Sequence, residues 1–359
     1  MNRDRGGKFG RGTGGTGRVP RALLAALVLA ASGAAAPVAH ANPYLAKAGE
    51  RPAAIRVATC AASGGFMHLY TAMEAGLFDK YGIKAEHVYI RGSHTSLAAL
   101  ASNEIQFLYC AADATIPGMA SGVDVKLIGA PLVGIPYVLL ARKDIKRPED
   151  LKGKSIGITT PGDLSHRLAK AMFRKFNFTE KDVTLRPLGG SQPERYTAMV
   201  QDVIQAIPVT PPLDVRGKKD GFNVIYNLND LGLPFIYSSL HTNAKTLREQ
   251  PQLVQRFVAA MAEAIHFVEK NPDRAKAAVG KVLKLTDQES LESSYQAYAK
   301  SIINRRMVVP AGAVAEAMDL AREAGTNVTR KPADLLDNTF AEHLEKSGFL
   351  KELWGGDVR

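Results

Sequence analysis

Small polar residues that could bind a ligand stand directly before several predicted helices. Loops of this kind expose backbone N–H groups, and the positive end of a helix favours an anionic group. The residue types therefore suit the binding of a small anion, although the two aspartates could equally act as helix caps. The candidates are Ser63, Gly64, Ser93, His94, Asp113, Thr160, Asp163 and Ser191.

Beyond residue 41, the sequence lacks the motifs of covalent, metal or nucleotide chemistry. The stretch GGSQP at 189–193 does not have the G-x-S-x-G pattern of a nucleophile elbow. H-E-x-x-H, C-x-x-C, G-x-G-x-x-G and P-loop patterns are also missing from this part of the sequence. His68, His94 and His166 lie near helix starts, where surface or packing roles are more common than acid–base roles. We therefore expect no catalytic residue, no metal and no cofactor.

A repeated unit indicates an internal duplication. RGSHTSLAALASNEIQF (91–107) and GGSQPERYTAMVQDVIQA (189–206) each combine a Gly-Ser pair, a helix-like run and an Ile-Gln pair. The Gln follows the Ser by 13 positions in the first copy and by 14 positions in the second. We infer that each copy is one βαβ element of two similar α/β lobes.

Apolar, β-rich runs alternate with helix-like segments in both halves of the chain. This alternation predicts a mainly parallel sheet flanked by helices in each lobe, with every strand-to-helix loop at the same sheet edge. The predicted strands are 55–60, 83–90, 105–110 and 125–130 in the first series, and 155–159, 183–188 and 203–209 in the second. The predicted helices are 66–78, 95–101, 114–119, 164–176 and 196–200.

Two extended segments interrupt this alternation, and a helical tail follows the second. The runs 137–142 and 234–240 should cross between the lobes. Residues 254–268 keep an apolar spacing of three to four, which predicts a long amphipathic helix that ends before Pro272. The predicted parts are a first lobe at 53–138, a second lobe at 143–230, and a return to the first lobe with C-terminal helices at 237–345.

The loops at the shared sheet edges should face a cleft between the lobes. Phe66, Tyr196 and Tyr237 could add a flat apolar wall to this cleft. A site built in this way binds a solute and closes over it, and it needs no reactive group. The loops concerned are 62–66, 92–95, 112–115, 160–165 and 189–192.

Thr160-Pro161-Gly162-Asp163 is the clearest local pattern of a helix start. Thr160 would cap the helix, Pro161 would take its first position, and Asp163 would face the positive helix end from the third. The same pattern also fits a well-capped helix that contacts no ligand.

The first 41 residues have the layout of a secretory signal. Six basic residues precede an apolar run at 22–36, and Ala39-His40-Ala41 is a small-x-small cleavage pattern. The apolar run is shorter than the roughly 20 residues that a membrane span needs, although an uncleaved anchor is the alternative. We expect cleavage before Asn42 and export to the periplasm.

The remaining chain carries a modest positive charge. Of 46 basic and 35 acidic residues, six basic and one acidic precede residue 42, which leaves a net charge of +6. Hydrophobic residues make up 46% of the chain and charged residues 23%, as in an ordinary globular protein. Basic residues are not clustered with aromatic ones, so we do not expect nucleic acid as a partner.

Cys60 and Cys110 end two strands that should be neighbours in the first lobe. Directly paired parallel strands rarely suit the geometry of a disulfide. We therefore expect two free thiols beside the cleft, with a disulfide as the alternative.

Five segments of the chain are similar to one known family. They are AMEAGLFDKYGI (72–83), SLAALASNEIQF (96–107), RPEDLKGKSIGITTPG (147–162), VTLRPLGG (183–190) and NPDRA (271–275). With them, the chain from Ile55 to about Phe340 resembles the nitrate/sulfonate/taurine-type solute-binding proteins of ABC importers, which include binders of thiamine-pyrimidine precursors. The resemblance implies a two-lobed periplasmic binding protein of type II that closes like a venus flytrap. It also implies a monomer that delivers a small-molecule ligand to a membrane permease and its ATPase.

The resemblance also implies site residues and one departure. Gln106 and Gln205 stand where family members commonly have Asp, and we expect each change to remove a negative charge near the cleft rim. A sulfonate, carboxylate or nitrate-like anion is the expected ligand, with a nitrogen heterocycle as the second choice. The ligand contacts that the family implies are Ser63, Gly64, Ser93, Asp113, Thr160 and Thr210.

Two other functions stay open at this point. The family resemblance includes thiamine-pyrimidine synthases, which use a Cys-rich iron-binding stretch and a Lys that holds a cofactor. The corresponding stretch here, 231–243, contains no Cys, which disfavours an enzyme. A ligand-sensing module that docks on a receptor could not be distinguished from a transport protein by sequence.

Overall fold

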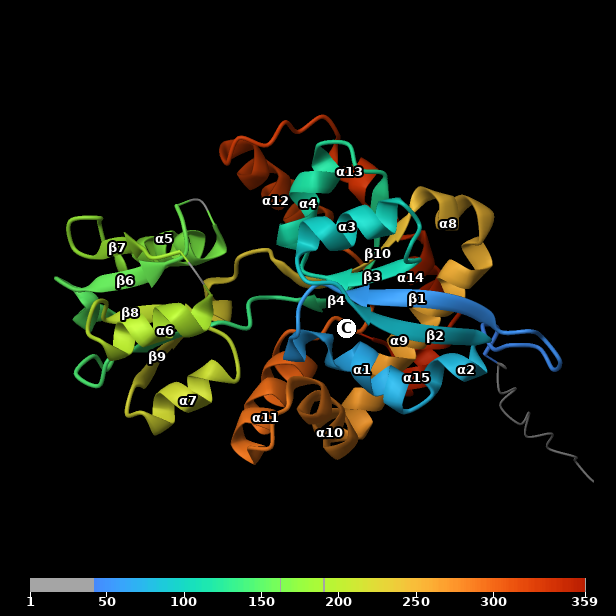
Figure 1. Cartoon of the computed structure of the whole chain (residues 1–359), viewed down its shortest axis with the longest axis horizontal. Coiled ribbons are helices and arrows are strands. Elements are labelled where there is room, and N and C mark those ends of the chain that lie inside the picture. The colour runs from blue at the N-terminus through green and yellow to red at the C-terminus, as the bar shows by residue number, and fades with distance from the viewer. Residues whose placement is uncertain (1–41, 162, 190, 359) are drawn as a thin grey trace, which may run out of the picture. The chain divides into compact units, whose positions relative to one another are not determined.

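Two five-stranded sheets form the framework of the chain. The structure is a computed structural model that describes residues 42–161, 163–189 and 191–358. The first sheet has the strand order β2-β1-β3-β10-β4, and the second has the order β7-β6-β8-β5-β9. In Figure 1 the strands of the second sheet, β5 to β9, are coloured green to yellow. The predicted signal, residues 1–41, lies outside the described residues.

The first sheet is mixed. β1 lies parallel to both β2 and β3, whereas β10 pairs antiparallel with β3 and with β4. Four strands therefore run in one direction and β10 runs in the other. The bounds are β1 Ala53–Thr59, β2 Ile83–Tyr89, β3 Phe107–Cys110, β4 Val125–Val133 and β10 Ile236–Asn243.

The second sheet follows the same plan. β6 lies parallel to β7 and β8, and β5 pairs antiparallel with β8 and β9. The two sheets thus share one strand order, and each contains one reversed strand. This agrees with the two similar lobes that the repeated sequence unit predicts, although the reversed strand was not predicted. The bounds are β5 Val138–Ala141, β6 Ser155–Ile158, β7 Thr184–Pro187, β8 Ala206–Val209 and β9 Asn223–Asn227.

The two reversed strands are the extended segments that were predicted to cross over. β5 follows β4 of the first sheet in the chain but pairs within the second sheet. β10 follows β9 of the second sheet but pairs within the first. Each crossover therefore ends as a strand inside the other sheet, and β5 already begins at Val138, where the first lobe was predicted to end.

Helices cover both faces of the first sheet. Figure 1 shows α3 and α4 on one face and α1, α2 and α9 on the other. α9 buries the apolar stripe that its spacing predicts, and Phe257 of α9 stacks on Phe107 of β3 with ring centroids 3.8 Å apart. The bounds are η1 Gly64–Phe66, α1 Met67–Glu74, α2 Leu77–Lys80, α3 Ser93–Ala101, α4 Ala112–Ala120 and α9 Pro251–Lys270.

The remaining C-terminal region is helical, as predicted. One stretch, η4 Gln296–Ser301, is a π-helix. None of the helices in the described part of the chain is long and apolar enough to cross a membrane. The other bounds are α8 Ala244–Glu249, α10 Pro272–Leu283, α11 Gln288–Tyr295, α12 Ala311–Glu323, α13 Pro332–Leu335, α14 Thr339–Lys346 and α15 Phe349–Trp354.

The second sheet also has a core on each face. α5 (Leu164–Phe176) has the bounds that its sequence predicts, and it packs Leu168 and Met172 into a cluster with Ile156 of β6. α6 (Gln192–Val200) contributes Tyr196 and Met199 to a separate cluster. Two elements of this sheet's half were not predicted, α7 (Leu213–Lys219) and β9. The α7 segment, LDVRGKK, is short and mostly polar, whereas β9, NVIYN, contains a short apolar run that was overlooked.

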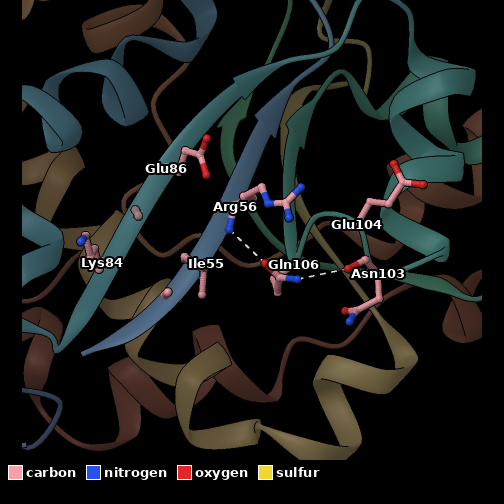
Figure 2. Close-up of a pocket in the computed structure, with 9 residues that line it drawn as sticks. Ile55, Arg56, Lys84, Glu86, Asn103, Glu104 and Gln106 are labelled. Carbon is pink, nitrogen blue, oxygen red and sulfur yellow. Dashed lines mark hydrogen bonds between the residues drawn. The ribbon is translucent and has the colours of Figure 1, made fainter. Parts of the chain in front are cut away.

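The two Ile-Gln pairs of the repeat occupy equivalent positions. Gln106 accepts a hydrogen bond from the backbone N–H of Arg56 at 2.9 Å, and its amide donates to the carbonyl of Asn103, as Figure 2 shows. Gln205 accepts in the same way from the backbone N–H of Ser155 at 3.0 Å. Each Gln therefore ties its own strand to the start of the neighbouring parallel strand.

This position corrects the expected location of Gln106 and Gln205. Both precede the strands β3 and β8, so they lie at the amino ends of these strands. The ligand loops follow the carboxyl ends, on the opposite edge of the sheet. The prediction that these residues change the charge near the cleft rim was wrong, because it ignored the direction in which the strands run.

Candidate functional site

A cavity of about 180 Å³ lies where the predicted ligand loops begin. The carboxyl ends of β1 and β3 form one part of it, and the two crossover segments and the start of α5 form the rest. Pockets that hold drug-sized ligands measure about 300–1,000 Å³. This cavity is smaller, so it suits a small solute. The lining residues are Cys60, Ala61, Ser63, Phe66, Ala111, Asp113, Tyr137, Leu164, Phe235 and Tyr237.

The loop after β1 needs its two glycines in order to pack against tyrosine rings. A Cβ atom at Gly65 would lie 2.5 Å from Cε1 of Tyr237, and one at Gly64 would lie 3.0 Å from Cε2 of Tyr298. Ser63 holds the loop by accepting a hydrogen bond from the Gly65 N–H at 3.1 Å. The backbone can therefore approach the two rings closely.

The two tyrosines come from distant parts of the chain. Tyr237 belongs to β10, and Tyr298 belongs to the π-helical stretch η4. Their rings stack with centroids 5.4 Å apart, and their hydroxyl groups lie 3.3 Å apart. Burial raises the pKa of both hydroxyls, so both are neutral hydrogen-bonding groups near neutral pH.

Tyr137 connects the cavity to the start of α6. Burial raises the pKa of its hydroxyl far above the ordinary value. Gln192, the first residue of α6, donates to this hydroxyl at 3.4 Å and accepts from the backbone N–H of Thr210 at 2.8 Å. Thr210 is therefore held beside the site by Gln192.

Two arginines of the second sheet's helices lie near this cavity. Arg195 of α6 is only 5% exposed, and its guanidinium donates to the carbonyl of Gly189 at 3.3 Å. Burial lowers its pKa, while Tyr137 and Asp163 counter this effect electrostatically. Arg167 of α5 forms an ion pair with Glu316 of α12 at 2.7 Å.

The cavity also has an acidic group, Asp113 in the first turn of α4. Burial raises the pKa of its carboxyl, and the backbone N–H groups of Asp113 and Ala114 and the charge of Arg167 act in the opposite direction. Asp113 lines a second, narrow hollow as well, together with Arg167. Asp113 is therefore the acidic residue that lines both hollows.

Cys60 and Cys110 form a disulfide, so the expectation of two free thiols was wrong. Their Cα atoms are 5.4 Å apart, within the usual range. β1 and β3 are parallel neighbours, but their last paired residues are Thr59 and Tyr109. Both cysteines therefore lie just beyond the paired register of β1 and β3, although Cys110 still pairs with Ser239 of β10. The bridge joins the loop after β1 to the last residue of β3.

The start of α5 differs from its prediction. Asp163 caps the helix, because its carboxylate accepts from the His166 N–H at 3.0 Å and from the Ser165 hydroxyl at 2.7 Å. Thr160 was predicted as the cap, but it lies in the turn before the helix, and its carbonyl accepts from the Asp163 N–H. An aspartate followed three residues later by a free backbone N–H gives the better cap here.

The structure brings some predicted site residues together and places others elsewhere. Ser63, Phe66, Asp113 and Tyr237 line the cavity, and Gly64 packs beside it. Ser93 and His94 begin α3, and His94 is exposed.

Ser191 and Tyr196 have structural partners in and around α6. Ser191 forms a capping box with Glu194 at the start of this helix. Tyr196 is only 2% exposed, and its hydroxyl donates to Asp220. The expected role of Tyr196 as a wall of the site is therefore not met, because its ring packs in the core on the α6 face of the second sheet.

Sequence reasoning missed two aromatic residues that line the cavity, Tyr137 and Phe235, and also Tyr298, which packs against Tyr237 and Gly64. Tyr137 and Phe235 lie beside the two crossover strands, so the aromatic residues that flank these segments were an available signal. Tyr298 gave no such signal, because it reaches the site from the helical tail. Among the described residues, no group of His, Cys, Asp and Glu could hold a metal ion.

Comparison with known proteins identifies the class to which this arrangement belongs. The NMT1/THI5-like family matches residues 64–275, and the chain belongs to this family. A candidate binding protein of Brucella abortus is 27% identical over 66% of this chain and 73% of its own length.

Solved structures of periplasmic binding proteins share the fold. The periplasmic aliphatic sulphonate-binding protein SsuA of Escherichia coli matches with a TM-score of 0.65 and 19% identity, over 80% of this chain and 92% of its own. The alkanesulfonate-binding SsuA of Xanthomonas axonopodis pv. citri, bound to MOPS, matches with a TM-score of 0.59 and 17% identity, over 81% and 100%. A Candida albicans protein with the generic periplasmic binding protein fold matches with a TM-score of 0.56 and 16% identity, over 80% and 97%. The chain thus has the periplasmic binding protein fold, as the resemblance in its sequence predicts.

Proposed function

We propose that the protein is the exported solute-binding component of an ABC importer and that its solute is a small organic anion. In this role it binds the solute outside the cytoplasmic membrane, in the periplasm, and delivers it to a membrane permease driven by an ATPase. The observation that carries the proposal is the small cavity at the carboxyl ends of the parallel strands, whose Tyr137 is electrostatically coupled to the buried Arg195.

The surroundings of the cavity suit an anionic group. Arg195 is electrostatically coupled to Tyr137, which lines the cavity, so a negative group beside Tyr137 would gain from this charge. Neutral hydroxyl groups on Tyr137 and Tyr237 and on Ser63 could donate further hydrogen bonds. The sulfonate ligands named for two structural neighbours support a sulfonate as the first class to test, and a carboxylate or nitrate as the next.

An enzyme on the same fold is the alternative, because the family resemblance includes a synthase. Residues 231–243, which correspond to the Cys-rich stretch of such enzymes, run from the end of η3 (Leu228–Leu231) through β10 and contain no cysteine. The two cysteines are joined to each other. These observations favour binding without turnover, whether the partner is a permease or a receptor.

A thermal-shift screen of the purified protein tests the proposal. The probes are alkanesulfonates, short carboxylates, nitrate and neutral analogues of the same size. A ligand at 100 times its Kd stabilises a binding protein by about 2.7 kcal/mol, so a true ligand should raise Tm by several degrees. Arg195→Lys should keep part of this response, and Arg195→Gln should lose most of it. Equal responses to anions and neutral analogues would contradict an anion site.

A further inference from the structure

The helices α7 and α11 belong to different halves of the framework and pack against each other. α7 lies between β8 and β9 of the second sheet, whereas α11 belongs to the C-terminal helices that follow β10 of the first sheet. The hydroxyl of Ser293 in α11 donates to Oδ2 of Asp214 in α7 at 2.8 Å. Lys219, at the end of α7, forms ion pairs with Asp287 and Glu289 at the start of α11, at 2.9 and 3.3 Å. Together these contacts form the α7–α11 interface.

Asp214 is buried in this interface with only part of its hydrogen bonds. The residue is 6% exposed, and its Oδ1 has no hydrogen-bond partner among residues 42–161, 163–189 and 191–358. A buried carboxyl group in this situation costs free energy, and water would satisfy both of its oxygens if the two halves moved apart. The hydroxyl of Ser293 therefore determines how large this cost is while the halves stay together.

Both sides of the α7–α11 interface are connected to the walls of the cavity. On the α11 side, Ser294 lies against the cavity loop, because a Cβ atom at Gly64 would lie 3.5 Å from its Cβ. On the α7 side, the chain enters the helix from Thr210, whose backbone N–H bonds to Gln192, and Gln192 donates to the hydroxyl of Tyr137 in the cavity wall. The interface is therefore formed in the same arrangement in which both halves contribute to the cavity.

We propose that Asp214 and Ser293 are positioning residues, which hold the two halves together around the solute without contacting it. Neither belongs to the described residues that line the cavity. The α7–α11 interface favours the closed arrangement described here and is lost when the halves separate, so it sets the fraction of solute-free protein that is ready to bind. The incomplete hydrogen bonding of Asp214 keeps this preference small, so the halves can separate again and release the solute.

The effect on solute affinity rests on the proposed function, whereas the effect on the two halves does not. The first experiment therefore measures their separation without any solute. Spin labels are attached to cysteines introduced at two exposed positions, Lys84→Cys in β2 and Lys175→Cys in α5. The native cysteines are joined to each other and do not take the label. Pulsed electron paramagnetic resonance then gives the distribution of distances between the halves.

Three variants are compared in this labelled background. Ser293→Ala removes the hydroxyl that bonds to Asp214. Ser301→Ala is the matched control, because the Ser301 hydroxyl is exposed and bonds to the carbonyl of Gln296 in its own helical segment. Ser293→Thr keeps a hydroxyl at the same position and should restore the wild-type behaviour.

In S293A the closed arrangement leaves a buried carboxyl group without its hydrogen bond, so the ratio of closed to separated molecules should fall about 5- to 100-fold. S301A and S293T should keep the wild-type ratio. A solute-free wild-type protein without the closed distance, or a distribution that S293A leaves unchanged, would overturn the proposal.

The second experiment measures the affinity of the same proteins for ethanesulfonate, butanoate and nitrate by calorimetry. For a probe that binds, the apparent Kd in S293A should rise by the factor by which the closed fraction falls. The distance in the solute-saturated protein should stay the same. A separation of the halves that left the Kd unchanged would contradict the role of Asp214 and Ser293 in binding. Failure of all three probes to bind would instead contradict the proposed function, and the distances would still test the α7–α11 interface.

Discussion

At the scale of single residues, two glycines without side chains are as important to the cavity as the side chains that line it. Gly64 and Gly65 are buried, and each occupies a place where a Cβ atom would meet a tyrosine ring. Tyr237 lines the cavity, so the absence of a side chain at Gly65 helps to set the position of a ring in the cavity wall.

Gly65→Ala should therefore weaken both folding and binding. The added Cβ would lie 2.5 Å from the Tyr237 ring, and overpacking of this kind costs about 1–3 kcal/mol of unfolding free energy. Urea denaturation and ligand titration measure the two effects. Gly312→Ala is the control, because its Cβ would meet nothing within 4 Å in α12. If G65A behaved like G312A, the close approach would not matter.

His68 makes the stability of the first sheet's helices sensitive to acid. Its ring is fully buried in α1, and its two nitrogens have no hydrogen-bond partner among the described residues. Burial lowers its pKa to about 4, although the charge of Glu269 acts in the other direction. The unfolded chain has the ordinary His pKa of about 6.5, so between pH 6.5 and 4 it binds a proton that the folded protein does not.

The free energy of unfolding should therefore fall as the pH is lowered through this window. The contribution of His68 at pH 5 is about 2 kcal/mol. His68→Leu should reduce the loss of unfolding free energy between pH 7.5 and pH 5 by this amount. His94→Leu, at an exposed position, should leave that loss unchanged. Denaturation curves at pH 7.5 and pH 5 measure the difference. The same loss of stability in H68L and wild type would contradict the assignment.

At the scale of elements, the carboxyl ends of the parallel strands border the cavity, whereas their amino ends form hydrogen bonds that hold neighbouring strands together. The carboxyl ends of β1 and β3 carry the disulfide and the loops that line the cavity. The amino ends of β3 and β8 carry Gln106 and Gln205, whose side chains bond to the neighbouring strands β1 and β6. A substitution at the amino ends can therefore change stability without altering the residues that line the cavity.

Replacing either glutamine should lower stability without changing ligand affinity. Gln205→Ala leaves the part-buried backbone N–H of Ser155 without its side-chain acceptor, which costs about 1–3 kcal/mol. Gln106→Ala should cost less, because the bond from the Arg56 N–H to Gln106 is exposed and water can replace it. Gln106→Glu keeps the acceptor oxygen and should be milder. Denaturation and calorimetry on the same samples test the separation. A large loss of affinity in a variant that remains fully folded would show that these residues act on the site after all.

The disulfide should make a larger contribution to stability. It closes a loop with a sequence separation of 50 residues, for which the chain-entropy model gives about 4 kcal/mol. Cys60→Ala with Cys110→Ala should lose an amount of this order, and wild-type protein treated with a reductant should approach the same value. Equal stability of the oxidised wild type and the double variant would contradict a structural role for the bridge.

How far the sequence predicts these elements depends on the range of the interactions involved. Local periodicity was enough for α5 and for the buried stripe of α9, and the repeated Gly-Ser and Ile-Gln unit correctly predicted two sheets of one plan. The disulfide was missed because it depends on where the register of β1 and β3 ends. Tyr298 was missed because only tertiary packing brings it beside Tyr237.

At the scale of the whole molecule, the C-terminal helices link the two sheets and do more than fill space. Glu316 of α12 pairs with Arg167 of α5, and Ser293 of α11 donates to Asp214 of α7 at 2.8 Å. Tyr298 of the same region reaches the cavity loop. Together with β5 and β10, which exchange places between the sheets, these contacts couple the two halves around the cavity.

The central claim is that this cavity holds a small anion and releases it unchanged. The most direct measurement is equilibrium dialysis of the purified protein against a mixture of sulfonates and carboxylates. The protein is then denatured, and the recovered solute is identified by mass. The account predicts one equivalent of a single anion per chain, recovered chemically intact. A chain that retains no solute, or one that returns a chemically altered product, would contradict it.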